Sequence, residues 1–259
     1  FDLVHNHSFS GFPLLLADTI GIPFLTTLHV APFLLEQVAA LRVLARNDTP
    51  ATLVAVSHAL ARAYQEVTAV TEVIHNGVSV PELAPGERTE DLLFIGRIAP
   101  EKGADLAIAV AHAAGRRLRL IGRIEDQVFY QRRIAPAVDG EQVVYLGHLP
   151  QREVWSAMAR AAALLFTPRW PEACSLAVLE GMALGTPAIA FAVGGLVEQI
   201  IDGQTGFLVP NGDLAGAAAA VGRLSRVSAE SCRAHIRQHF SQSAMVGAYE
   251  AFYRERLVK

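Results

Sequence analysis

The chain has 259 residues, of which 52% are hydrophobic and 18% are charged. This composition excludes a disordered chain, and the length suits two modest α/β domains or one large one. The formal net charge of −3 gives no electrostatic reason to expect nucleic-acid binding. Only 2 cysteines occur, which gives neither a disulfide framework nor a metal site and favours a reduced, cytoplasmic setting.

Residues 1–79 are predicted to form part of a parallel α/β domain. Strands are expected at residues 1–6, 22–29, 52–57 and 72–75, and helices at residues 11–20, 32–46 and 58–65. Strands and helices that alternate at this spacing indicate βαβ units. The chain begins at Phe1 without a methionine, and few strands precede residue 80. We therefore expect a partial N-terminal domain and a chain that is a fragment.

Residues 80–90 are rich in Pro, Gly and Glu and are predicted to be an interdomain linker. The alternation then resumes, with strands expected at residues 91–98, 117–122, 142–147, 163–168, 187–191 and 206–209. Helices are expected between them at residues 103–114, 127–138, 151–162, 176–184, 196–201 and 214–224. Residues 91–240 thus predict a complete doubly wound domain, in which ligands bind at the carboxyl ends of the strands.

The tail of the chain is helical by pattern, and its aromatic rings are expected to be packed: Tyr249, Phe252 and Tyr253. The apolar window at residues 176–197 is long enough to resemble a membrane span. It contains Glu180, a Gly-Thr-Pro break and a Gly-Gly pair. We therefore expect two buried elements there and no transmembrane segment.

Two glutamates stand out in the segment at residues 167–191. Ser175 is expected to cap a helix at residues 176–184, which Gly185 and Pro187 end. Glu172 then lies just before this helix and Glu180 lies inside it. Because the two would not share a helix face, they converge only if the loop carries Glu172 toward Glu180.

A second candidate site follows the first strand of the second domain. Gly96-Arg97 and the turn at residues 100–103, which includes Lys102, place two cations and two glycines around a strand-to-helix turn. This arrangement suits a diphosphate, although on spacing alone an ordinary surface turn with an Arg and a Lys is the favoured interpretation. No GxGxxG follows a strand, and neither a P-loop nor an Asp-x-Asp pair occurs. A bound diphosphate would therefore be balanced without metal, by Arg97, Lys102 and the amino end of the helix at Leu176.

His29 ends a buried strand and His7 follows another, so both are candidates to face a crevice. A structural role is the alternative for each of them. The Gly194-Gly195 pair offers unhindered backbone N–H groups after a strand, which is a weak signal alone.

Four motifs together resemble the retaining glycosyltransferases of family 4, also called glycosyl transferases group 1. They are GR-x-x-PEKG at residues 96–103, PE-x-x-SLAVLEGMALGTP at residues 171–187, GG-x-x-E at residues 194–198 and DG-x-TGFLVP at residues 202–210. The resemblance implies an α/β fold of the GT-B type, with two Rossmann-like doubly wound domains facing across a cleft. It also implies that the first strand of the N-terminal domain, with its Gly-rich loop, is absent. Residues 241–259 would form a helix that packs back on that domain.

The resemblance assigns roles in a donor site. Glu180 would hold the ribose of the nucleotide, and Glu172 would contact the transferred sugar. Arg97, beside Gly96, and Lys102 would bind the diphosphate and stabilise the charge that develops on it.

Backbone N–H groups would add to this phosphate site at Ser175, Leu176 and Ala177. Ser175 replaces a glycine that the family often has. His29 would face the donor sugar, and with His7 it forms the acceptor side. Arg123 and the loop after Gly147 are candidates for reading the base. Asn76-Gly77 matches the turn that ends the N-terminal domain.

The function implied is retaining transfer of a hexose from a nucleotide-diphosphate sugar to an acceptor hydroxyl. UDP-sugar is favoured and GDP-sugar is second, with no metal and no other cofactor. Two alternatives stay open: another GT-B enzyme, such as a sugar-nucleotide epimerase or a phosphorylase, and a non-catalytic or partner-dependent nucleotide-sugar-binding protein. The expected partners are the nucleotide sugar and an acceptor, without nucleic acid. The missing N-terminal segment or a second chain would complete the first domain.

Overall fold

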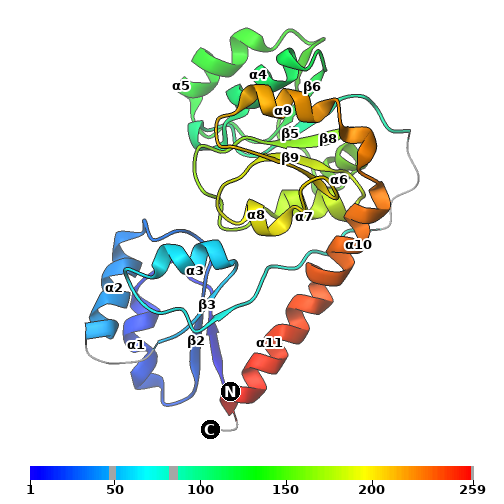
Figure 1. Cartoon of the computed structure of the whole chain (residues 1–259). Coiled ribbons are helices and arrows are strands. Elements are labelled where there is room, and N and C mark those ends of the chain that lie inside the picture. Colours follow the sequence, from blue (N-terminus) through cyan, green and yellow to red (C-terminus); the bar gives the residue numbers. More distant parts are fainter. Residues whose placement is uncertain (47–50, 82–86, 258–259) are drawn as a thin grey trace. The chain divides into compact units, whose positions relative to one another are not determined.

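The structure is a computed structural model that describes residues 1–46, 51–81 and 87–257. It divides into two compact units (Figure 1). Unit 1 comprises Phe1–Gly77, Glu172–Cys174 and Gln242–Lys259, and unit 2 comprises Val78–Pro171 and Ser175–Ser241. Residues 82–86 of the expected linker lie outside the described residues.

Unit 1 is built on a parallel sheet with the strand order β1-β2-β3-β4. Its strands are β1 (Val4–Asn6), β2 (Phe24–Leu28), β3 (Thr52–Ala55) and β4 (Glu72–Val73). Its helices are α1 (Phe12–Ile20), α2 (Leu35–Arg46), α3 (His58–Tyr64) and α11 (Gln242–Leu257). Each predicted strand and helix of residues 1–79 is confirmed, with its ends trimmed by a few residues.

The two faces of this sheet are covered by different helices. Leu28 and Leu53 pack with side chains of α1, α2 and α3, whereas Leu25 and Val54 pack with Phe252 of α11. This assignment follows from the alternation of side chains along a strand. Tyr249 and Tyr253 join the second cluster, so the predicted packing of the tail aromatics is confirmed.

Unit 2 has a six-stranded parallel sheet with the order β10-β9-β8-β5-β6-β7. The strands are β5 (Leu92–Ile95), β6 (Leu118–Ile121), β7 (Val143–Tyr145), β8 (Ala163–Phe166), β9 (Ala188–Phe191) and β10 (Gly206–Val209). The α-helices are α4 (Ala104–Ala113), α5 (Gln127–Phe129), α6 (Gln151–Arg160), α7 (Leu176–Ala183), α8 (Leu196–Gln199), α9 (Leu214–Val221) and α10 (Ala229–His239). All six predicted strands are present.

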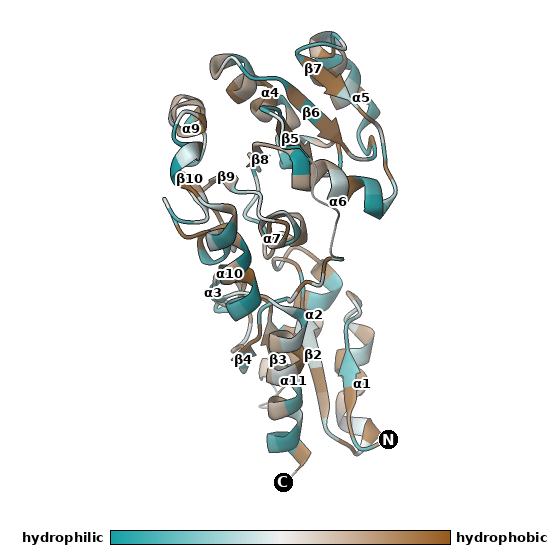
Figure 2. Cartoon of the chain, turned by 90° about the vertical axis from the view of Figure 1, so that its right-hand side faces the viewer, coloured by the Kyte–Doolittle hydropathy of each residue, from teal (hydrophilic) through white to brown (hydrophobic). Residues whose placement is uncertain are grey.

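Helices cover both faces of this sheet (Figure 1). Helices α4 and α9 pack together on one face, and α7 packs with α6 and α10 on the other. Strands buried on two faces are apolar throughout rather than alternating, as in the fully buried β8 (ALLF) and β9 (AIAF). Figure 2, coloured by hydropathy, shows brown hydrophobic segments in the strands of this unit, for example in β6 and β7. Among the described residues, no helix is both long enough and apolar enough to cross a membrane.

The strand order has a switch point between β5 and β8. From β5 the chain runs outward through β6 to β7, then returns to β8 on the other side and runs outward through β9 to β10. Connections that leave in opposite directions open a crevice at the carboxyl ends of the two central strands. A ligand site is therefore expected at the loops after β5 and β8.

One predicted element differs from the structure. Residues 127–138 were expected to form a single helix, but α5 is followed by a π-helical stretch at Tyr130–Ile134 and a 3-10 turn at Ala135–Ala137. Pro136 lies in that turn. Proline lacks a backbone N–H and its ring crowds the preceding turn, so a regular helix cannot continue through it.

The surroundings of Gly103 show that the loops after β5 and β8 pack closely. It has φ of +73°, and a Cβ at this position would collide with the carbonyl oxygen of Thr167. Gly140 has a similar φ of +78° but open space around it. We expect Gly140→Ala to lower the free energy of unfolding of unit 2 by about 1–2 kcal/mol through backbone strain. Gly103→Ala should cost a further amount of about 1–3 kcal/mol from overpacking.

Urea unfolding, followed with a probe of unit 2, measures both variants against the unsubstituted chain. Equal losses for Gly103→Ala and Gly140→Ala would contradict the close packing of the two loops.

Candidate functional site

The candidate donor residues of unit 2 follow the carboxyl ends of three neighbouring strands. Gly96, Arg97 and Lys102 follow β5, Arg123 follows β6, and Ser175, Leu176, Ala177 and Glu180 follow β8. Groups that are up to 84 positions apart in sequence (180 − 96) thus share one edge of the sheet. This edge includes the switch point between β5 and β8.

The loop after β8 is tied directly to the loop after β5. The Thr167 hydroxyl donates to the carbonyl of Gly103 at 2.8 Å, and the Arg169 N–H donates to the carbonyl of Glu101 at 2.9 Å. The Arg169 guanidinium donates to the carbonyl of Pro100 at 2.7 Å and to both carboxylate oxygens of Asp105, at 2.9 and 2.7 Å. These bonds fix the backbone turn that carries Lys102.

Arg169 and Asp105 were not identified from the sequence. Burial would raise the pKa of Asp105, but hydrogen bonds and charge from Arg169 and Arg133 outweigh it and hold the pKa below its usual value. Asp105 is therefore the ionised anchor of Arg169. The two residues are 64 positions apart in sequence, so no short-range sequence motif links them.

The two arginines of the candidate site are exposed and have acidic neighbours. Arg97 Nη2 lies 2.9 Å from Glu101 Oε1, and its Nη1 lies 4.0 Å from Glu125 Oε1. Arg123 pairs with the same Glu125. Exposed ion pairs contribute only about 0.2–1 kcal/mol, so turning either guanidinium toward an anion costs little.

The amino end of α7 is held in place by a buried glutamine. Gln199 is 2% exposed; its Oε1 accepts from Ser175 N–H at 3.1 Å and its Nε2 donates to the Ser175 carbonyl at 3.2 Å. The Ser175 hydroxyl accepts from Val178 N–H at 3.5 Å, which confirms the predicted N-cap. The first N–H groups of a helix have no partner within the helix, so this end is suited to an anion. Gln199 also went unrecognised in the sequence.

Glu180 lies half-buried on α7. Gln151, the first residue of α6, donates from Nε2 to Glu180 Oε2 at 3.1 Å. Burial raises the pKa of Glu180, while Trp155 and Gln151 act in the opposite direction. Trp155 Nε1 is buried without an acceptor in hydrogen-bonding geometry among the described residues, so Gln151 is the side chain that makes a well-formed hydrogen bond to Glu180. The carboxylate is thus partly desolvated, as a group that accepts ligand hydroxyls would be.

The remaining candidates belong to unit 1. Glu172 lies there with Ala173 and Cys174, which pack against the cluster of α1, α2 and α3. Convergence of Glu172 with Glu180 stays a prediction. His7 and His29 are brought together at the ends of β1 and β2, with His7 Nδ1 3.0 Å from His29 Nε2.

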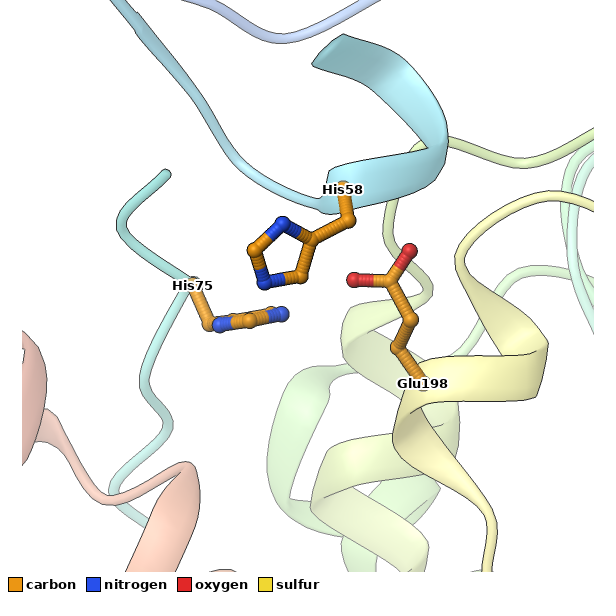
Figure 3. Close-up of side chains that lie close together, drawn as sticks. All are labelled: His58, His75 and Glu198. Carbon is orange, nitrogen blue, oxygen red and sulfur yellow. The ribbon is translucent and has the colours of Figure 1, made fainter. Parts of the chain in front are cut away.

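Two other features do not coincide with the predicted site. His58 of α3 and His75 have ring centroids 5.7 Å apart in unit 1 (Figure 3, which also draws Glu198 of α8 in unit 2). Two imidazoles alone are fewer ligands than a zinc site uses, and we assign no metal to them. A cavity of about 360 Å³ lies against α6 and is lined by the ion pair of Arg119 and Asp91 and by a mixture of polar and apolar residues. None of the predicted donor residues lines it.

A family model and the curated relatives both show similarity to glycosyltransferases. Residues 79–240 match the family model described as "Glycosyl transferases group 1". A "D-inositol 3-phosphate glycosyltransferase" from Kribbella flavida is 31% identical over 85% of this chain and 63% of its own length. A "Glycogen synthase" from Mycobacterium tuberculosis is 30% identical over 85% of this chain and 59% of its own length.

A solved structure shows the same fold. Anabaena Alr3699/HepE in complex with UDP and glucose superimposes with a TM-score of 0.80 at 21% identity, covering 98% of this chain and 78% of that one. The chain therefore has the GT-B type of fold, with two Rossmann-like units. It spans less than two thirds of the length of the two curated relatives.

The raised pKa of Glu180 has a measurable consequence for stability. A carboxyl group whose pKa is higher in the folded state opposes folding once the pH rises above its unfolded pKa. Glu180→Gln removes the desolvated charge, so we expect its midpoint of thermal unfolding to exceed that of the unsubstituted chain at pH 7. As the pH falls below the unfolded pKa of 4.5, the carboxyl becomes increasingly protonated in both states and the difference should shrink.

Glu141→Gln, at an exposed glutamate of unit 2, is the matched control and should show no such pH-dependent gain. A Glu180→Gln variant that is less stable at pH 7 than at pH 4, relative to the unsubstituted chain, would show that hydrogen bonding outweighs desolvation.

Proposed function

Because the chain belongs to the glycosyl transferases group 1 family, we propose that it transfers a hexose from a nucleotide-diphosphate sugar to an acceptor hydroxyl. The observation that carries this proposal is the set of anion-binding features on both sides of the switch point in unit 2. They are the Arg97 and Lys102 turn after β5 and the amino end of α7 after β8. UDP-sugar is the first choice of donor, supported by the fold shared with a protein solved with UDP and glucose. GDP-sugar is the second.

The diphosphate of such a donor gains negative charge when the bond to the sugar breaks. Two cationic side chains and the backbone N–H groups of Leu176 and Ala177 supply positive potential at one edge of the sheet. The backbone that carries these groups is held before any ligand binds, through Arg169, Thr167 and Gln199. Preorganised groups of this kind stabilise a leaving group without the cost of reorganising at the moment of reaction. We propose that they do so without a metal ion.

Glu180 suits the ribose. An ionised carboxylate has two oxygens and only accepts hydrogen bonds, so it can hold two neighbouring hydroxyls at once. Its partial desolvation strengthens such bonds. We assign Glu172 and His29 to the transferred sugar, with His7 and His29 on the acceptor side and Arg123 near the base.

The proposed reaction retains the configuration at the sugar carbon. The bond from that carbon to the diphosphate oxygen breaks, and the acceptor oxygen bonds to the same face. The acceptor proton passes to the departing diphosphate, so no protein nucleophile is needed. The named relatives point to different acceptors, an inositol phosphate and glycogen, which makes the donor the shared part of the proposal. The cytoplasmic setting rests on cysteine usage and stays a prediction.

Substitution of the two glutamates should affect different quantities, UDP affinity for Glu180 and turnover for Glu172. Glu180→Ala is expected to weaken UDP binding by about 1.5–3 kcal/mol, the usual contribution of hydrogen bonds to a charged group. Glu172→Ala should leave UDP affinity nearly unchanged but lower turnover, because its partner is the sugar at the reacting carbon. Calorimetry with UDP and steady-state kinetics with a UDP-hexose measure the two effects, and Glu141→Ala is the control.

Other outcomes separate the alternatives. Donor binding without turnover on any acceptor would indicate a nucleotide-sugar-binding protein. Release of an altered nucleotide sugar without an acceptor would indicate an epimerase, and a requirement for inorganic phosphate would indicate a phosphorylase. Equal loss of UDP affinity in the Glu172 and Glu180 variants would contradict the division of roles.

A further inference from the structure

Three histidines and two tyrosines form one connected cluster at the carboxyl ends of β1 and β2. We infer that His7 and His29 share one proton as a hydrogen-bonded dyad, and that a relay from α11 through Tyr253 and His5 holds His7 in position. His5 and His7 are then positioning residues for His29, the member of the dyad that the proposed function places at the transferred sugar. The inference rests on the proposed function for the role of His29, but not for the existence of the dyad.

The geometry of the dyad is that of a hydrogen bond. His7 Nδ1 and His29 Nε2 are 3.0 Å apart, while the ring centroids are 5.3 Å apart, and the rings are inclined by 28°. The difference of 2.3 Å (5.3 − 3.0) is about two ring radii, so both nitrogens lie close to the line between the centroids. A straight N–H···N contact has this form. Two ligands of a tetrahedral metal ion would instead aim at a point off that line.

Only one proton fits between the two facing nitrogens of the dyad. In the neutral state one of the two facing nitrogens carries the proton and the other accepts it. One extra proton can be taken up at the outer nitrogens, but a second N–H between the rings would face the first. Burial and the charge of His7 lower the pKa of His29, and burial lowers the pKa of His7, so the neutral pair is favoured. The tautomer of His29 is therefore tied to that of His7.

The relay fixes the ring of His5 at both of its nitrogens. His5 Nδ1 lies 2.6 Å from the hydroxyl of Tyr253, and its Nε2 lies 2.7 Å from the hydroxyl of Thr27. The Thr27 hydroxyl also lies 2.9 Å from that of Tyr249. Burial is the main cause that lowers the pKa of His5 to about 4, with further contributions from His7 and His29. At neutral pH His5 is thus a neutral ring with one donor and one acceptor, both in use.

The ring of His5, which is held at both nitrogens, packs against the ring of His7. The two ring centroids are only 3.9 Å apart, tilted by 40°. The backbone after β1 is held as well, because Ser8 N–H donates to Asn6 Oδ1 at 3.0 Å and Asn6 Nδ2 donates to Thr26 Oγ1 at 3.1 Å. His7 itself is exposed, so its contacts with His5 and His29 are what restrict its ring.

The consequence concerns which atom His29 offers to a ligand. If His7 donates from Nδ1, His29 accepts at Nε2 and carries its own proton on Nδ1. If His29 donates from Nε2, its Nδ1 is an acceptor. The direction of the hydrogen bond within the dyad therefore decides whether the outer nitrogen of His29 is a donor or an acceptor, and recognition of a sugar hydroxyl depends on that choice. His5 on β1 is the titratable group in contact with the dyad, and Tyr249 and Tyr253 of α11 in turn contact His5.

The test is nitrogen NMR of the full chain without ligand. A through-hydrogen-bond coupling between His7 Nδ1 and His29 Nε2 is expected at neutral pH, and it should disappear as the pH is lowered through the titration of the dyad. In His7→Phe, which keeps a ring but removes the nitrogens, the pKa of His29 should rise toward 6.5. Its two tautomers should approach the mixture of a free imidazole. Tyr253→Phe should change the tautomer of His5.

His112→Gln, at an exposed histidine of α4, is the control and should leave all three signals unchanged. Absence of the coupling in the unsubstituted chain would overturn the dyad, even if His7→Phe fails to fold. An unchanged His29 in a folded His7→Phe variant would overturn the positioning role. Because no donor is present, these results stand whether or not the chain transfers sugar. If the unsubstituted chain shows the coupling but no turnover of a nucleotide sugar, the dyad stands and the proposed function is contradicted.

Discussion

The packing of the loop after β5 against the loop after β8 is the constraint on which the candidate donor site depends. Gly103 has no Cβ because the carbonyl of Thr167 occupies that space, and the Thr167 hydroxyl bonds back to Gly103. Arg169, anchored on Asp105, adds two more bonds to the same turn. These contacts join the two strands that flank the switch point. They set where Lys102 and the amino end of α7 lie before any ligand arrives.

This arrangement gives the motif GR-x-x-PEKG two separate tasks. The cations Arg97 and Lys102 offer charge, and Gly103 lets the turn approach the neighbouring loop. Exposed ion pairs with Glu101 and Glu125 hold the arginines only weakly, whereas the backbone beneath them is bonded at several points. The side chains can therefore adjust to an anion while the backbone N–H groups stay fixed. A rigid frame that carries adjustable charge suits a leaving group whose charge grows during reaction.

Most of the fold was predictable from the sequence because its strands and helices are locally consistent. The apolar runs at β5, β8 and β9, the cap at Ser175 and the stop at Gly185 each have a local cause. The π-helical stretch after α5 was missed, because a helical pattern does not show how far Pro136 disturbs the turns before it. Arg169, Asp105 and Gln199 were missed for a different reason. Their partners lie 24 to 64 residues away, and only the strand order brings them together.

The most direct test of the donor site is amide hydrogen exchange of the full chain with and without saturating UDP, in the presence of a metal chelator. Backbone N–H groups in residues 96–103 and 175–178 should exchange more slowly when UDP is bound, because they belong to the two loops that flank the switch point. Protection confined to other segments, or binding that appears only when a divalent metal is restored, would contradict this account.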